Sequence, residues 1–179
     1  DSDLTLSGNF SNSAGTVNLN SDKNEFASII VQGTSSGNIT YKRYVADVGE
    51  NEWDYIGSPV AGQNLQTLID NNSSLATGGD GNSQVAIGVF DNGAGSDNAD
   101  SMYTNYSTTG NSGVTITSGQ GFVMATDDGE TTATVDFTGT VNTSNVAFPI
   151  ENESSNTNYG KFNLVANPFP SYIAFNTAA

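Results

Sequence analysis

Apolar and polar residues alternate in short runs along most of the chain, and Gly, Asn, Asp and Ser separate the runs. Alternation with a period of two places every second side chain on the same face, which is typical of a half-buried β-strand. In residues 38–45, Ile39, Tyr41 and Val45 fall on one face. The other runs of this kind are residues 4–6, 17–19, 26–31, 53–60, 85–90, 114–117, 121–125, 132–138, 146–150 and 162–165. About eleven short strands predict an all-β fold of the β-sandwich or jelly-roll class.

One segment has the periodicity of a helix. Leu65, Leu68 and Ile69 recur at positions i, i+3 and i+4, and Asn64 is suited to cap the helix N-terminus. We therefore expect one short helix that ends near residues 71–72 and packs its apolar side against the core.

Turn-forming residues predict the connections. Asp128-Gly129 lies between the runs 121–125 and 132–138 and favours a primed turn, which predicts a β-hairpin of these two strands. The long polar stretches are expected to be surface loops, and they are residues 78–83, 91–101 and 151–160.

The first 36 residues differ from the rest of the chain. Runs 4–10, 15–20 and 26–33 are separated by Ser, Asn and Gly turns and recur every 11 to 13 residues, roughly. This spacing predicts the end of a β-solenoid in which each run is one rung, and the alternative is the edge of an ordinary β-sandwich. We expect two parts, a solenoid-like entry in residues 1–36 and a β-sandwich module in residues 37–179.

The charge balance narrows the classes of function. The 179 residues contain 4 Lys and Arg against 19 Asp and Glu, a net charge of −15, and neither His nor Cys. Nucleic-acid binding is excluded because it needs clustered cations, and the residues of a Ser-His-Asp triad, a disulfide or a His/Cys zinc site are missing. No apolar run approaches the about 20 residues of a membrane-spanning helix, so we expect no membrane insertion. Acidic charge with many Asn, Ser, Thr and Gly suits a secreted protein.

Five phrases occur in order along the chain. They are Thr40-Tyr41-Lys42-Arg43-Tyr44-Val45, Trp53-Asp54-Tyr55-Ile56-Gly57-Ser58-Pro59-Val60, Gly119-Gln120-Gly121-Phe122-Val123-Met124, Val135-Asp136-Phe137-Thr138-Gly139-Thr140-Val141-Asn142 and Phe162-Asn163-Leu164-Val165-Ala166-Asn167-Pro168-Phe169-Pro170-Ser171. Together they resemble a module of large secreted cell-surface proteins of gliding, type IX-secreting Gram-negative bacteria, which follows solenoid repeats and precedes a sorting domain. The resemblance covers nearly the whole chain and implies export to the cell surface or the medium, as part of a longer protein. It implies no set of catalytic residues.

One loop has the composition of a calcium site. Residues 91–100 contain the carboxylates of Asp91, Asp97 and Asp100, with two amides and two glycines. Because Ca²⁺ takes about six to eight oxygen ligands from flexible loops, these three residues predict a structural Ca²⁺ site. The alternative is a solvated loop of turn-forming residues. Asp100-Ser101-Met102 also resembles a short O-glycosylation signal of these bacteria.

Aromatic side chains offer a second kind of site. Sugars stack on exposed aromatic rings while nearby polar groups bind their hydroxyls. Trp53 and Tyr55 alternate on one face of a predicted strand, and Tyr103 and Tyr106 lie in a polar segment that we expect to be exposed. These four residues predict a carbohydrate-binding surface. The alternative for Trp53 is a place in the core.

Paired carboxylates are the only catalytic device that this composition offers. Candidates such as Asp54 and Asp136 lie in ordinary alternating strands, so we expect no enzyme. The sequence favours a non-enzymatic extracellular or cell-surface module for adhesion or assembly, whose partners are other modules of the same longer chain or copies of itself. The alternative is a carbohydrate-binding module of a secreted polysaccharide-degrading enzyme, with glycans as partners.

Overall fold

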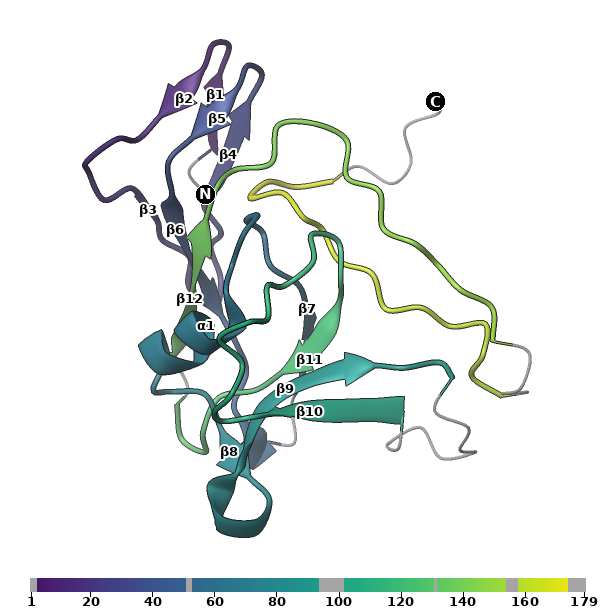
Figure 1. The fold of residues 1–179 in the computed structure, drawn as a ribbon. Coiled ribbons are helices and arrows are strands. Elements are labelled where there is room, and N and C mark those ends of the chain that lie inside the picture. The colour runs from purple at the N-terminus through teal and green to yellow at the C-terminus, as the bar shows by residue number, and fades with distance from the viewer. Residues whose placement is uncertain (1–2, 51–52, 94–101, 131, 154–157, 174–179) are drawn as a thin grey trace.

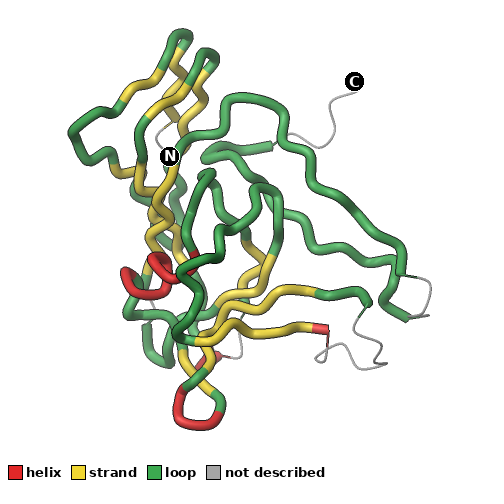
Figure 2. Tube along the Cα trace, in the orientation of Figure 1, coloured by secondary structure: helices red, strands yellow, loops and turns green. Residues whose placement is uncertain are grey.

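The computed structural model describes residues 3–50, 53–93, 102–130, 132–153 and 158–173. This part of the chain is built mainly of short strands, with one short α-helix and long loops, which confirms the predicted all-β fold (Figures 1 and 2). The strands are β1 (Asp3–Leu6), β2 (Phe10–Ser11), β3 (Asn18–Leu19), β4 (Ser28–Val31), β5 (Ser35–Ser36), β6 (Ile39–Tyr44), β7 (Asp54–Ile56), β8 (Thr77–Gly78), β9 (Gln84–Phe90), β10 (Tyr103–Ser107), β11 (Phe122–Met124) and β12 (Thr134–Gly139). The helices are α1 (Leu65–Asn71) and the 3₁₀ turns η1 (Val48–Glu50) and η2 (Asp80–Asn82).

The N-terminal strands form two stacked coils. The first coil consists of β1, β2 and β3, and the second coil consists of β4, β5 and β6. Each strand of the first coil pairs in parallel with its counterpart in the second, β1 with β4, β2 with β5 and β3 with β6. Hydrogen-bonded side chains such as Asp3 and Ser28 are 25 residues apart. Figure 1 shows the two coils projecting side by side from the rest of the molecule.

This geometry corrects the predicted spacing of the solenoid. The runs 4–10 and 15–20 are not successive rungs but sides of the same coil, and the second coil begins in the run 26–33. The chain returns to the same position after 25 residues at β1 and β2 and after 22 residues at β3, because each coil contains three strands and their corners. The predicted boundary between residues 36 and 37 falls inside the second coil, which β6 completes. The division into two domains stays a prediction.

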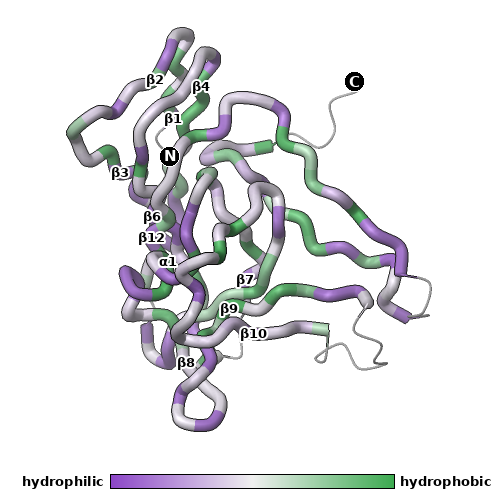
Figure 3. Tube along the Cα trace, viewed as in Figure 1, coloured by the Kyte–Doolittle hydropathy of each residue, from purple (hydrophilic) through white to green (hydrophobic). Residues whose placement is uncertain are grey.

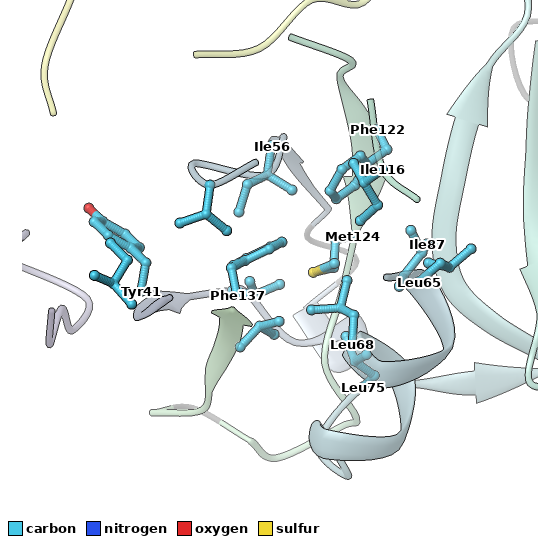
Figure 4. Close-up of a cluster of buried hydrophobic side chains, with 14 of the residues drawn as sticks. Tyr41, Ile56, Leu65, Leu68, Leu75, Ile87, Ile116, Phe122, Met124 and Phe137 are labelled. Atoms are coloured by element: carbon cyan, nitrogen blue, oxygen red, sulfur yellow. The ribbon is translucent and has the colours of Figure 1, made fainter. Parts of the chain in front are cut away.

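Two larger sheets enclose the main core. One sheet has the order β12-β6-β3, and the other, the β9 sheet, has the order β10-β9-β11-β7 with β8 beside β9. Their apolar faces meet around Phe137, which is completely buried. Met124 of the β9 sheet lies beside Phe137, and Ile87 lies farther along the same core, beside Leu65 (Figure 4). Hydrophobic residues run along β9, whereas the turn around η2 is more hydrophilic (Figure 3). Two sheets with facing apolar sides make the sandwich that the alternation predicts.

The helix forms where the sequence predicts it. Asn64 caps α1, since its side-chain oxygen accepts a hydrogen bond from the backbone N–H of Thr67 at 3.0 Å. Leu65 and Leu68 are buried against the core, and Asn72 ends the helix. In the described part of the chain no helix has the length and apolar character needed to cross a membrane.

The predicted hairpin at Asp128-Gly129 is wrong. The turn itself forms, because Gly129 adopts a φ of +87° and the N–H of Glu130 donates to the carbonyl of Asp127 at 3.1 Å. However, β11 pairs with β7 and β9, whereas β12 pairs with β6. The turn therefore carries the chain from one sheet to the other, so that each strand contributes to a different wall of the core.

Three predicted strands do not form ladders, and β5, β8 and β10 form where no strand was predicted. Residues 114–117, 146–150 and 162–165 are irregular, with single bridges from Thr115 to Asn64 and from Val165 to Gln120. They lie beside loops rather than beside a continuous strand, so a ladder cannot extend. The segment expected to be an exposed polar stretch, 102–107, instead contains β10.

Candidate functional site

The C-terminal segment 158–173, here called the strap, runs along the β9 sheet and then to the second coil (Figure 1). The N–H of Gly121 donates to the carbonyl of Leu164 at 3.1 Å, and the N–H of Ile29 donates to the carbonyl of Pro170 at 2.7 Å. A Cβ at position 121 would lie 2.9 Å from the Leu164 carbonyl oxygen. Glycine is needed there because the strap passes so close.

One face of the β9 sheet carries aromatic side chains instead of packing into the core. Val123 aligns with Tyr55 on one side and with Gly88 on the other, and Tyr103 aligns with Phe90. Because every second residue of a strand shares a face, Tyr55, Phe90 and Tyr103 lie on one face. The alternate residues of the same strands form one wall of the core.

The strap completes an aromatic groove over this face. Its lining residues are Tyr55, Phe90, Tyr103, Tyr159, Phe162, Asn163 and Leu164, around a volume of about 400 Å³. The rings of Phe90 and Tyr103 are tilted, with centroids 5.4 Å apart, and those of Tyr159 and Phe162 are 6.4 Å apart. Tyr55 is 69% exposed and Phe162 is 60% exposed. The groove is therefore open to solvent on both of its aromatic sides.

Gly88 allows close packing on the face of the sheet beside the groove. A Cβ at this position would lie 2.6 Å from Oδ1 of Asn105 and 2.9 Å from Cγ2 of Val123. Because Gly88 has no side chain, the side chains of Asn105 and Val123 can pack directly against the backbone of β9.

The hydroxyl of Tyr103 is held in its neutral form. Burial, together with a smaller contribution from a side-chain hydrogen bond with Tyr55, raises the pKa of Tyr103 to about 12. A neutral phenol can both donate and accept hydrogen bonds. Tyr55 and Tyr103 therefore offer the groove two hydrogen-bonded hydroxyl groups as well as two aromatic rings.

A more polar hollow of about 220 Å³ adjoins the aromatic groove and shares Phe90 and Phe162 with it. Its polar lining includes Asp91, Asn92, Gln120 and Glu151. Asn92 is buried and donates to the carbonyls of Glu151 and Gly160 at 3.1 and 3.2 Å. These two hydrogen bonds connect the end of β9 to residue 151 and to the strap, next to the aromatic groove and the polar hollow.

The structure brings together two of the four predicted carbohydrate-binding residues. Tyr55 and Tyr103 share the groove, whereas Trp53, which is 39% exposed and so outside the core, does not line it. Tyr106 packs against the main core, and burial raises its pKa. The alternation of β10 separates it from Tyr103, since residues three apart in a strand point to opposite faces. Sequence reasoning missed Phe90, Tyr159 and Phe162.

The predicted calcium ligands are described only in part. Asp91 accepts a hydrogen bond from the N–H of Gly93 at 2.8 Å, while Asp97 and Asp100 lie outside the described residues, as does Ser101 of the glycosylation signal. Within the described ranges, no three acidic side chains come together as a metal-binding group. Calcium binding by Asp91, Asp97 and Asp100 stays a prediction.

The two carboxylates considered for catalysis have structural partners. Asp54 accepts a hydrogen bond from the N–H of Ala46 at 2.9 Å. Asp136 forms a salt bridge with Lys42 at 2.7 Å, between two partly exposed side chains. Neither residue lines the aromatic groove.

Fold and site define an all-β module in which two parallel coils lead into a sandwich that carries an aromatic groove on its outer face. The chain belongs to the family described as Domain of unknown function (DUF8693), which matches residues 10–178. Comparison of the chain with curated proteins and with solved structures found no match.

Proposed function

We propose that this chain is a non-enzymatic extracellular binding module and that its aromatic groove takes a carbohydrate. One observation carries the proposal: five aromatic side chains surround a single hollow outside the core, and Tyr55 and Phe162 are more than half exposed there. Leaving such rings in water forgoes the stabilisation that their burial would bring. A cluster of exposed apolar rings marks a binding surface.

The chemistry of the lining favours a neutral sugar. Aromatic rings offer flat faces to the C–H side of a sugar ring, and the Tyr55 and Tyr103 hydroxyls are placed to bond its hydroxyl groups. Leu164 is the one aliphatic residue of the lining, and none of the lining residues is charged. An acidic glycan would find no cation among them. Asp91 and Glu151 in the adjoining hollow can accept hydrogen bonds from further sugar hydroxyls.

Carbohydrate binding would attach the protein that carries this module to a glycan-coated surface. We favour such an adhesive role at the cell surface or in the medium, which the acidic, cysteine-free composition and the resemblance to secreted surface proteins support. The same groove would also serve a secreted polysaccharide-degrading enzyme, where the module would hold the enzyme on its substrate. In both cases the chain binds and does not cleave.

A glycan array followed by calorimetry with the purified chain tests this proposal. We expect Tyr55→Ala and Tyr103→Ala each to weaken binding of a neutral oligosaccharide at least about tenfold, which corresponds to about 1.4 kcal/mol. Trp53→Ala is the matched control, because Trp53 is an exposed aromatic residue next to the same strand and does not line the groove. Its affinity should equal that of the parent.

Three results would contradict the proposal. One is an array without any bound glycan. Another is binding that Tyr55→Ala and Tyr103→Ala leave unchanged while thermal melts show that both variants are folded. The third is release of reducing sugar from a polysaccharide panel, which would show that the chain is an enzyme.

A further inference from the structure

The first coil has an unpartnered edge. Among the described residues, β1, β2 and β3 each pair with one strand only, their counterpart in the second coil. Phe10 and Asn12 donate their N–H groups to the second coil. Backbone groups of a strand point alternately to its two sides, so the N–H groups of Thr5 and Ser11 point away from the second coil. An edge of this kind is a ready template for another strand.

The inward-facing side chains are covered in the second coil and partly open in the first. Leu4 and Ile29 occupy the same position in the two coils, yet Leu4 is 49% exposed and Ile29 is 2% exposed. Leu6 and Val31 differ in the same sense, since Leu6 is half-buried and Val31 is buried. The end of a solenoid needs a polar cap to remain soluble, and the first coil lacks one at these positions.

A pair of equivalent glycines gives independent evidence. Gly33 cannot carry a side chain because its Cβ would lie 2.8 Å from the backbone carbonyl of Gly8 in the coil before it. Gly8 holds the same position in the first coil, and a Cβ there would meet nothing within 4 Å. Neither glycine has a positive φ. Neither a close contact nor a positive φ requires glycine at position 8, but a coil stacked on it would supply the close backbone contact that Gly33 already has.

The opposite end of the two-coil stack is covered at β6 and at β4, whereas β5 pairs only with β2 among the described residues. β12 covers β6, and the strap covers β4 through the hydrogen bond from Ile29 to Pro170. Among the described residues, only the first coil leaves the outer edges of all three of its strands unpaired. Continuing this interface requires a parallel coil with the pattern apolar-x-apolar-x-Gly, which both Leu4–Gly8 and Ile29–Gly33 follow.

We propose that the open end of the first coil is a stacking site for a further parallel β-coil of the same 25-residue pattern. The occupant forms backbone hydrogen bonds with β1 and β2, where the 25-residue register holds, covers Leu4, and places its own backbone over Gly8. This proposal does not depend on the carbohydrate site. A second copy of the chain is a poorer occupant, because two copies related by a two-fold axis would pair their β1 strands antiparallel and bring two net charges of −15 together.

The experiment adds one coil to the whole protein. A duplicate of residues 3–27 is joined directly before Asp3, so that the added coil keeps the 25-residue register. We expect amide exchange of Thr5 and Ser11 to slow about tenfold or more relative to the parent, because both N–H groups gain partners. The added coil with Leu4 and Leu6 of the duplicate changed to Asp is the matched control and should leave the exchange rates of Thr5 and Ser11 unchanged.

Glycine substitutions sharpen the test. In the parent, Gly33→Ala should lower the Tm by about 3 °C or more, since a loss of about 1 kcal/mol corresponds to about 2–4 °C at this size. Gly8→Ala should leave the Tm of the parent unchanged. In the extended protein, Gly8→Ala should abolish the added protection of Thr5 and Ser11.

Two outcomes would overturn the proposal. The first is fast exchange of Thr5 and Ser11 in the extended protein, with Gly8→Ala as neutral there as in the parent. The second is a dimer of the unextended parent in light scattering that Leu4→Asp converts to a monomer, which would assign the surface to a second copy.

Discussion

The N-terminal coils and the β9 sheet both leave surface without a partner, but they expose different chemical groups. The first coil exposes a backbone edge beside half-covered aliphatic side chains. The β9 sheet instead exposes a face of aromatic rings with phenol hydroxyls. A strand edge accepts another strand through main-chain hydrogen bonds, whereas a groove of placed rings and polar groups selects a small ligand. This difference is the reason why we propose assembly for one region and ligand binding for the other.

The two regions nevertheless share one core, and the largest effect should come from breaking it. Phe137 is completely buried in the cluster that also contains Ile29 of the second coil and Met124 of the β9 sheet. We expect Phe137→Ala to lower the free energy of unfolding by about 3–5 kcal/mol. Urea unfolding, followed by Trp53 fluorescence and by circular dichroism, measures the loss. Phe162→Ala removes the same kind of ring from an exposed position and should cost less than about 1 kcal/mol.

Both probes should report a single transition in the parent and in Phe137→Ala. If the far-ultraviolet signal of the strands were lost in two steps, the coils and the sandwich would be separately folding domains. The shared core would then not couple them.

The next largest effect is a difference in stability loss between substitutions in the second coil, which is covered, and in the first coil, which is open. Ile29→Ala should cost about 2–5 kcal/mol, because the side chain is almost completely buried. Leu4→Ala removes the equivalent side chain from the open end and should cost less than half as much, since Leu4 is 49% exposed. Equal losses in urea unfolding would mean that the first coil is already covered in solution.

The smallest effect concerns the alkaline titration of the groove. Burial and the hydrogen bond with Tyr55 raise the pKa of Tyr103 to about 12, above its ordinary value of 10. The neutral phenol therefore contributes stability that is complete below pH 10 and is lost as the pH rises through about 12. Tyr55→Phe should lower the pKa of Tyr103, because it removes the hydrogen bond and leaves the burial. NMR titration of the Tyr103 ring measures this.

Trp53→Phe serves as the control and should leave the Tyr103 titration unchanged. Ionisation of Tyr103 near pH 10 in the parent would contradict the packed pair of tyrosines. The groove would then lack the arrangement on which its proposed ligand depends.

Local patterns predicted the local structure well. Asn64 caps α1 as its side chain suggests, and the alternation over residues 38–45 corresponds to β6 (Ile39–Tyr44). Pairing was harder, because a turn signal such as Asp128-Gly129 specifies a turn and not the sheets that its strands join. The 25-residue repeat is visible once Leu4–Gly8 is aligned with Ile29–Gly33. A comparison of neighbouring runs does not reveal this repeat, because neighbouring runs are different sides of the same coil.

The candidate site was predictable in its strand residues and not in its strap residues. Tyr55 and Tyr103 were identified by residue type and neighbourhood, and recognising β10 as a strand would have separated Tyr106 from them. Tyr159 and Phe162 reach the groove because the strap crosses the sheet at Gly121. That contact joins segments far apart in the sequence, and no local pattern encodes it.

We propose above all that the aromatic face of the β9 sheet binds a carbohydrate. The most direct measurement is an NMR titration of the parent with the neutral oligosaccharide that binds best on the array. We expect shifts of the ring resonances of Tyr55, Phe90, Tyr103 and Phe162, and none at Leu4 in the first coil. Shifts confined to the coils or to Trp53, with the groove unchanged at saturation, would contradict it.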